Sequence, residues 1–100
     1  MKEAEFQRMV IDLAGIYDWR VAHFRTVFAN GRWLTPVAGD GAGFPDLVLA
    51  KPGHDALFAE LKTDTGRLSP AQKLWANALP LVHVWRPRDW NRIEATLRGN

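Results

Sequence analysis

Three charged residues stand at the ends of the most strand-like segments of this chain. Asp46 opens the apolar run LVLA. Glu60 and Lys62 close a second run, ALFAELK, at residues 56–62. Because Glu60 and Lys62 are two positions apart, a strand points their side chains to the same face. A hairpin between the two runs can bring Asp46 beside Glu60, so the spacing predicts a pair of carboxylates with a lysine next to them.

The chemistry that such a cluster could support is metal-assisted hydrolysis of a phosphodiester. Two neighbouring carboxylates repel each other, and a divalent cation between them removes that repulsion. Mg²⁺ prefers oxygen ligands and keeps several waters, so two carboxylates and a phosphate oxygen suit it. The ion activates a bound water, and a nearby lysine can orient or deprotonate that water or neutralise charge in the transition state. For any one residue a solvated pair or a turn is the simpler interpretation, but the three together favour a site.

Apolar periodicity places the cluster in an alternation of helices and strands. Apolar residues at helical spacing predict an amphipathic helix over residues 3–17. Strands are predicted at residues 19–24, 46–50, 56–62 and 81–85. Residues 25–43 contain Asn30-Gly31, Pro36 and three later glycines, and they are predicted to form a long loop with room for a short strand at RWL.

Helix-start signals complete the pattern. Ser69 is the predicted N-cap, Pro70 the first helical residue, and Gln72 completes a capping box. This helix is expected to run to about Leu79, and Asp89 is expected to cap a last helix. The order α-β-β-β-α-β-α predicts an α/β sandwich with a mixed sheet. The β-α-β crossover would make the last two strands parallel.

Length and composition predict one domain over residues 1–100. Hydrophobic residues make up 47% of the chain, which is enough for a core. The absence of cysteine excludes disulfides and thiolate metal sites. The N-terminus lacks the apolar core of a signal peptide and no run is long enough to span a membrane, so a cytoplasmic protein is expected.

The net charge of +2 is unevenly distributed. Residues 40–66 carry five acids against two bases, whereas residues 19–39 carry three arginines and no acid. An acidic segment between basic ones fits a cation site within a phosphate-binding surface. The basic residues that could contact phosphate are Arg25, Arg32, Arg67, Lys73, Arg86 and Arg88. Trp33 is the candidate for stacking on an unpaired base. His23 and His83 are interpreted as structural, and no histidine pair has zinc spacing.

The motifs GFPD (residues 43–46), FAELK (58–62) and GRLSPAQKLW (66–75) closely resemble the PD-(D/E)xK nuclease superfamily. Within it they resemble the VRR-NUC (virus-type replication-repair nuclease) domain, which has a G-x-P-D strand, an E-x-K strand and a helix opening with S/T-x-x-Q-x-x-W. The resemblance covers nearly the whole chain. It implies a restriction-endonuclease-like three-layer sandwich with a mixed central sheet.

The resemblance also implies roles for individual residues. Asp46, Glu60 and the backbone carbonyl of Leu61 would be metal ligands, and Lys62 would be the catalytic lysine. Gln72 would line the catalytic site, although its capping box already gives it a structural role. The superfamily often adds a glutamate from the first helix, and Glu3 and Glu5 both qualify. They lie on opposite sides of the apolar stripe at equal angles, so helical phase does not choose; we favour Glu3, with Gln7 one turn on.

The function implied by the resemblance is a Mg²⁺- or Mn²⁺-dependent endonuclease acting in DNA repair on branched DNA, including four-way (Holliday) junctions, as a homodimer. Such proteins would be cytoplasmic and nucleoid-associated in a bacterial or phage-infected cell. Nicking of flaps or duplexes is the nearest alternative. A non-catalytic DNA-binding module on the same fold would show an eroded catalytic set, yet Asp46, Glu60 and Lys62 are all present. A protein-interaction subunit would need no such cluster.

Overall fold

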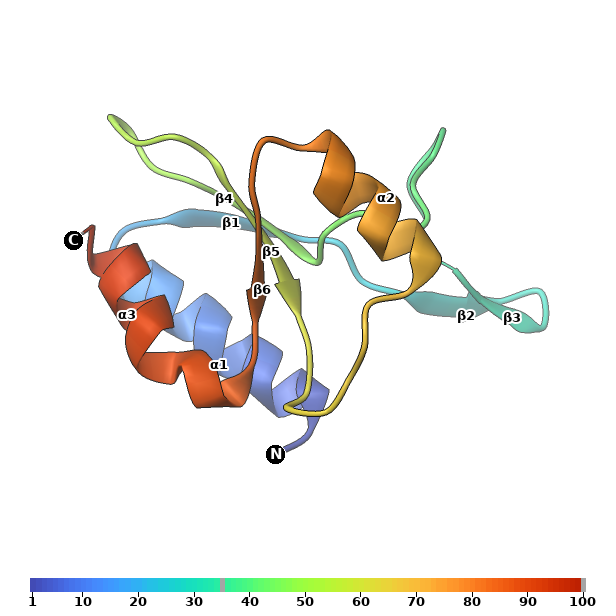
Figure 1. Cartoon of the computed structure of the whole chain (residues 1–100), viewed down its shortest axis with the longest axis horizontal. Helices are drawn as coiled ribbons and strands as arrows, with labels where there is room; N and C mark the ends of the chain where they lie inside the picture. Colours follow the sequence, from blue (N-terminus) through green and yellow to red (C-terminus); the bar gives the residue numbers. More distant parts are fainter. Residues whose placement is uncertain (35, 100) are drawn as a thin grey trace.

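The computed structural model describes residues 1–34 and 36–99 and has three layers. Its elements are α1 (Glu3–Ile16), β1 (Arg20–His23), β2 (Val27–Ala29), β3 (Arg32–Leu34), β4 (Leu47–Ala50), β5 (Leu57–Leu61), α2 (Pro70–Ala78), β6 (Val82–Trp85), a 3₁₀ turn η1 (Pro87–Asp89) and α3 (Trp90–Arg98). A four-stranded sheet of order β1-β4-β5-β6 lies in the middle, with α1 and α3 on one face and α2 on the other (Figure 1). The α/β sandwich expected from the sequence is therefore confirmed.

The strands of this sheet pair in the way that the sequence predicted. β1 is antiparallel to β4, β4 is antiparallel to β5, and β5 runs parallel to β6. The predicted β4–β5 hairpin and the parallel crossover pair are both confirmed. In the hairpin Leu47 lies opposite Ala59. Asp46, one residue before β4, is therefore level with the last residues of β5, among them Glu60.

The hydrophobic core lies between the sheet and the layer of α1 and α3. Phe6, Val10 and Ala14 recur on one side of α1 and are buried. The sheet residues buried in the same core are Leu47, Leu49, Ala59, Leu61 and Trp85. By contrast, no residue of α2 is buried. The two faces of the sheet are thus packed unequally, and most of the apolar burial is on the side of α1 and α3.

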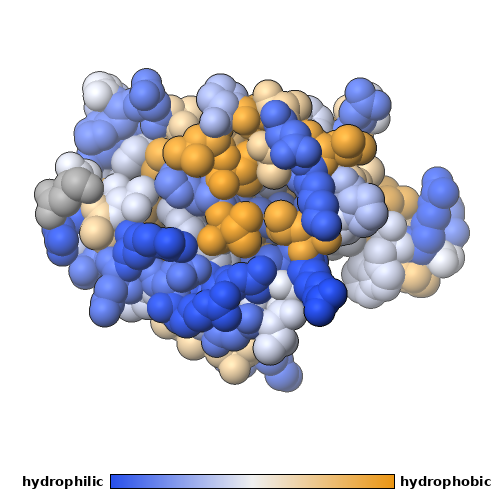
Figure 2. All heavy atoms as spheres, in the orientation of Figure 1, coloured by the Kyte–Doolittle hydropathy of each residue, from blue (hydrophilic) through white to orange (hydrophobic). Residues whose placement is uncertain are grey.

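The surface reflects this difference. Figure 2 shows apolar side chains gathered where α2 and β6 lie in Figure 1, above a hydrophilic surface over α3. Leu74 on α2 and Leu81 before β6 are 72% and 61% exposed. No helix in the described residues combines the length and the apolar character needed to cross a bilayer.

Residues 27–34 form a hairpin where the sequence predicted mostly loop. β2 and β3 pair antiparallel as a separate two-stranded sheet, and β3 is the short strand allowed for at RWL. Asn30 and Gly31 have φ angles of 54° and 76°, which match the type I′ turn that Asn-Gly favours. The loop prediction was wrong here because each strand has only three residues, too few to show an alternating pattern. The order of elements contains one hairpin more than expected.

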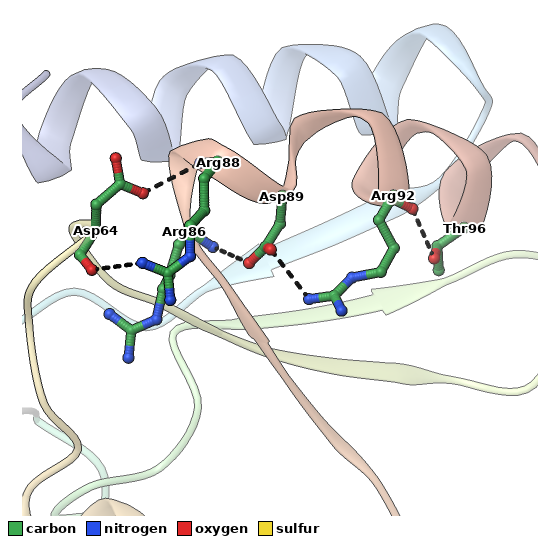
Figure 3. Close-up of polar contacts among 6 residues, drawn as sticks. All are labelled: Asp64, Arg86, Arg88, Asp89, Arg92 and Thr96. Carbon is green, nitrogen blue, oxygen red and sulfur yellow. Dashed lines mark hydrogen bonds and ion pairs between the residues drawn. The ribbon is translucent and has the colours of Figure 1, made fainter.

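Asp89 precedes the last helix as predicted, but it closes the turn before the helix. Its side chain makes no capping hydrogen bond with α3. Instead, Asp89 Oδ2 accepts a hydrogen bond from the backbone N–H of Arg86 at 3.0 Å, and Oδ1 lies 3.3 Å from Arg92 Nη2 (Figure 3). The predicted cap is wrong because the tight turn at Pro87 brings the Arg86 N–H closer to the carboxylate than the first N–H groups of α3.

His83 lies in β6 on the side of the core, opposite Ala59. Its ring is half-buried and lies 5.3 Å from the ring of Trp85, between centroids. Burial lowers the pKa of His83, and the positive charge of Arg92 lowers it further. This position fits the structural role expected from the sequence, because a neutral ring can pack in the half-buried site without the cost of burying a charge.

We predict that His83→Gln reduces the acid sensitivity of folding. A histidine whose pKa is depressed in the folded state leaves stability unaffected above its unfolded pKa of about 6.5. As the pH falls below that value, the unfolded chain takes up the proton first, so the wild-type protein loses stability that the variant keeps. Melting temperatures measured from about pH 8 to pH 5 test this. Parallel curves for the two proteins would contradict it.

Candidate active site

A polar cavity of about 310 Å³ opens at the end of the sheet, where β1 and β5 end and β4 begins. The first turns of α1 and α2 approach it from the two faces of the sheet. The site residues predicted from the sequence that line it are Glu3, Asp46, Glu60, Lys62 and Gln72, together with Arg25 and Gln7. A wider groove of about 510 Å³ follows α2 and is lined mainly by apolar residues. The chemistry is therefore concentrated in the smaller cavity.

Asp46 is fixed between the strands on either side of β4. Its carbonyl accepts a hydrogen bond from the N–H of Phe24, at the end of β1, at 2.8 Å. Its carboxylate Oδ2 accepts one from the N–H of Leu61, at the end of β5, also at 2.8 Å. The backbone that follows Glu60 thus holds the Asp46 carboxylate in place. The closeness of the two acids is built into the hairpin and does not depend on a flexible side chain.

Glu60 is the buried carboxyl group of the site, with 3% of the residue exposed. Its Oε1 accepts a hydrogen bond from Gln72 Nε2 at 2.9 Å. Burial and, after it, the adjoining Asp46 raise the pKa of Glu60 to about 9, against the opposing charge of Lys62. With no cation beside it, this carboxyl group therefore holds its proton at neutral pH. If Glu60 were ionised as well, three carboxylates would line the cavity against two cations, Arg25 and Lys62.

Gln72 joins the start of α2 to this carboxyl group. The predicted capping box is confirmed: Ser69 Oγ accepts from the N–H of Gln72 at 3.2 Å, and Gln72 Oε1 accepts from the N–H of Ser69 at 2.8 Å. The amide oxygen of Gln72 thus caps the helix while its amide nitrogen holds Glu60. One side chain thus forms the predicted cap and lines the cavity, and its role in catalysis stays a prediction.

Lys62 follows β5 and extends its parallel pairing, because its N–H donates to the carbonyl of Trp85 at 3.0 Å. Its side chain lines the cavity. The positive charge of Lys62 lowers the pKa of both Glu60 and Glu3, against the burial that raises them. The ammonium group is therefore close to the carboxylates on both sides of the cavity.

The first helix contributes Glu3 and not Glu5. Glu3 and Gln7, one turn apart, both line the cavity, whereas Glu5 is exposed and is not among the lining residues. Partial burial raises the pKa of Glu3, and the charge of Asp46 adds to the effect. Packing of the apolar side of α1 on the sheet settles the choice that helical phase left open.

The basic residues and Trp33 predicted to bind DNA are spread over several surfaces. Arg25 lines the cavity, and Arg32 and Trp33 are exposed on the β2–β3 hairpin. Arg67 and Lys73 are exposed near the start of α2. Asp40 lies in the groove along α2, where its carbonyl accepts a hydrogen bond from Trp75 Nε1 at 2.9 Å.

Arg86 and Arg88 hold the segment between β5 and α2. Arg86 Nη1 donates to the carbonyls of Thr63 and Gly66 at 2.6 and 2.7 Å. The backbone N–H and the Nη1 of Arg88 donate to Asp64 at 3.1 and 2.9 Å (Figure 3). These bonds tie the segment after Lys62 to the end of β6. Both arginines therefore have a structural function, and phosphate binding by Arg86 stays a prediction.

Three residues of the cavity were not among the sequence candidates: His23, Phe24 and Thr26. His23 was interpreted as structural. Its position at the cavity follows from its pairing with Leu47, which sets the end of β1 beside Asp46. A sequence pattern that reveals a strand does not reveal its register with a partner, so no local signal marked these residues.

Packing in the structure explains the spacing of the motifs, beginning with Gly43. Its φ angle is +77°, and a Cβ on this residue would collide with Ala71 and lie 2.6 Å from the backbone nitrogen of Gln72. The ring of Phe44 then packs edge-on against Trp75, with centroids 4.9 Å apart. The segment before Asp46 is thus fitted directly against the turn of α2 that carries Gln72.

We predict that Gly43→Ala displaces the start of α2 and reduces the stability of the fold. Gly53 is a matched control, because its φ angle is +82° but no atom lies within 4 Å of the added Cβ. Gly53→Ala should cost only the backbone strain of a left-handed residue, about 1–2 kcal/mol. Gly43→Ala should cost clearly more, since it adds a collision with backbone atoms. Equal losses in the free energy of unfolding, measured with urea, would show that the close approach of Gly43 to α2 is unimportant.

The donor set suits a small, hard cation. In the part of the chain that the structure describes, no three His, Cys, Asp or Glu side chains are grouped closely enough to hold an ion by themselves. Mg²⁺ does not need such a cage, because one or two carboxylates, waters and a substrate phosphate satisfy it. Asp46 and Glu60 supply two carboxyl groups, and burial together with Asp46 raises the pKa of Glu60 to about 9. A cation would offset the burial and the repulsion from Asp46 that together keep Glu60 protonated, so the residues present fit a divalent metal.

Comparison with known proteins agrees with this geometry. The model of the VRR-NUC domain family matches residues 27–80, from β2 to just beyond α2. Searches of the curated proteins and of the solved structures found no match. The matched segment contains Asp46, Glu60, Lys62 and Gln72, which are four of the residues around the cavity. Since the match covers more than half of the chain, this protein belongs to the VRR-NUC family of nuclease domains.

Proposed function

We propose that this protein is a Mg²⁺- or Mn²⁺-dependent endodeoxyribonuclease that hydrolyses phosphodiester bonds in branched DNA. The observation that carries the proposal is the pairing of Asp46 with the buried Glu60 in a cavity that also contains Lys62. Two neighbouring carboxyl groups that cannot both ionise contribute little to the stability of the fold. They become useful when a cation and a phosphate occupy the same cavity.

Each residue has a role that follows from its position. Asp46, Glu60 and the carbonyl of Leu61 would hold the metal, which supplies an activated water and polarises the phosphate. Gln72 and the N–H of Leu61 keep the two carboxyl groups oriented. Lys62 can hold the attacking water or neutralise the charge that builds on the phosphate oxygens. Glu3 lines the same cavity and would be a further metal ligand, bound directly or through water.

We further propose that the protein acts as a homodimer on DNA junctions. The described chain measures about 41 × 29 × 21 Å, so one copy spans roughly one turn of duplex DNA. A two-fold symmetric dimer would present two cavities to two strands, which suits the resolution of a four-way junction. Cleavage of flaps or nicking of duplexes would need only one cavity.

One experiment tests the activity. Labelled duplex, flap and four-way junction DNA are incubated with the protein in the presence of Mg²⁺, Mn²⁺ or a chelator. The proposal expects metal-dependent internal cleavage, strongest on the branched substrates. A protein that binds these DNAs and cuts none of them with either metal would instead be a DNA-binding module on a nuclease fold.

The roles of the three charged residues predict different effects on the metal. Asp46→Asn and Glu60→Gln keep the size and the hydrogen-bond acceptor but remove a ligand charge, so each should lower both metal affinity and cleavage, the latter by at least about 100-fold. Lys62→Ala should lower cleavage by a similar factor, yet leave metal affinity equal or higher because a nearby cation is gone. Calorimetric titration with Mn²⁺ and single-turnover cleavage measure the two effects.

All three proteins should remain folded, which thermal melting will establish. If Glu60→Gln cleaved DNA at the wild-type rate with Mg²⁺, the metal-ligand assignment would fail. If all three variants melted early and none lost activity per folded molecule, the cluster would be a structural ion pair.

Variants of Ser69 and Gln72, at the start of α2, can separate the capping role of Gln72 from its proposed role in catalysis. Ser69→Ala removes the bond that Ser69 Oγ accepts from the N–H of Gln72 but leaves the bond from Gln72 to Glu60. Gln72→Ala keeps that N–H and removes both side-chain bonds of Gln72, the capping bond from the N–H of Ser69 and the bond to Glu60. Each variant should lose about 0.5–2 kcal/mol of stability. At an assay temperature well below both melting temperatures, only Gln72→Ala should also cleave DNA more slowly than the wild-type protein. Equal cleavage rates for the two variants would limit Gln72 to the helix cap.

A further inference from the structure

The β2–β3 hairpin projects from the body of the molecule, beyond the start of α2 in Figure 1. Its root is part of the candidate active site, because Arg25 and Thr26, directly before β2, line the catalytic cavity. A two-stranded hairpin contributes little stability alone. An element that reaches outward from the edge of a catalytic cavity is well placed to contact the substrate.

Two aromatic side chains share one side of this hairpin. Phe28 and Trp33 are opposite each other in the strand pairing, with ring centroids 5.2 Å apart and planes at 57°. Phe28 is 60% exposed and Trp33 is 70% exposed. Among the large hydrophobic residues that the described chain exposes, these two are the aromatic ones. Exposed aromatic surface next to a site indicates that something binds there.

The charge around the hairpin indicates what binds. Residues 24–34, which form the hairpin and its root, contain Arg25 and Arg32 and no acidic residue. Flat apolar rings on an element whose charged residues are all basic suit a ligand with a flat apolar face and negative charge, which describes a nucleotide.

We propose that Phe28 and Trp33 form a stacking platform for an unpaired or splayed nucleobase beside the cleavage site. In continuous duplex DNA both faces of each base are covered by neighbouring bases. A face becomes available at a branch point, a flap or a gap, where stacking on an aromatic side chain adds affinity. The platform would therefore select DNA that is interrupted close to the bond being cut. This inference rests on the proposed nuclease function and specifies its substrate.

The test compares two DNAs that contain the fluorescent base 2-aminopurine, either at the branch point of a flap or within a matched duplex. Binding is measured in the presence of a chelator, so that no cleavage occurs. The double variant Phe28→Leu with Trp33→Leu keeps apolar surface and removes the rings. Leu74→Ala, at a residue that is 72% exposed on α2, is the control for loss of exposed apolar surface elsewhere.

The wild-type protein and Leu74→Ala should change the fluorescence of the branch-point base, and the double variant should not. The double variant should bind the flap at least about fivefold more weakly, with less than a twofold change for the duplex. Equal weakening on both DNAs, or no weakening on the flap, would overturn the platform. Melting temperatures should be unchanged, since both rings are exposed.

Two further measurements separate this inference from the proposed function. If the wild-type protein cleaves flap and duplex equally well, and the double variant does the same, the platform is wrong and the nuclease stands. If the wild-type protein stacks the base but cuts neither DNA with Mg²⁺ or Mn²⁺, the nuclease function is wrong. Light scattering adds a third outcome: a smaller mass for the double variant would make the hairpin a contact between copies and would also overturn the platform.

Discussion

The repulsion between the carboxyl groups of Asp46 and Glu60 is the constraint around which this structure is built. Two features keep the groups together in spite of it. The N–H of Leu61 holds Asp46, and the amide of Gln72 holds Glu60. Both donors are neutral, so they orient the acids without cancelling their charge. Lys62 opposes part of the charge, and a cation in the cavity would balance the rest, as the proposed metal-dependent mechanism requires.

The surrounding motif residues serve this arrangement by fixing α2 against the sheet. Gly43 allows the chain to approach the first turn of α2, and the rings of Phe44 and Trp75 pack beside that contact. Because Gln72 both caps α2 and binds Glu60, a shift of the helix would move the hydrogen bond to the buried carboxyl group. The geometry of the site therefore depends on helix docking as much as on the strands that carry its charges.

Local patterns in the sequence were sufficient to predict most of this arrangement. The E-x-K spacing, the hairpin and the capping box are short-range features, and each is present in the structure. Long-range pairing and packing were beyond the sequence: the register of β1 with β4 placed His23 at the cavity, and the packing of α1 placed Glu3 there instead of Glu5. The β2–β3 strands were missed because three residues are too few to establish a period. The metal-binding and catalytic roles assigned to the site residues remain predictions.

The two faces of the sheet are packed unequally, and the more tightly packed face carries the hydrophobic core. The core under α1 and α3 buries Trp85 and the apolar side of the strands, so it supplies most of the stabilising burial. The face under α2 has no buried helix residue, and there the sheet meets the helix through polar and aromatic contacts near the cavity. Stability and chemistry are thus placed on opposite sides of one sheet. A destabilising charge cluster can be tolerated at the end of that sheet because the core that offsets it lies on the other side.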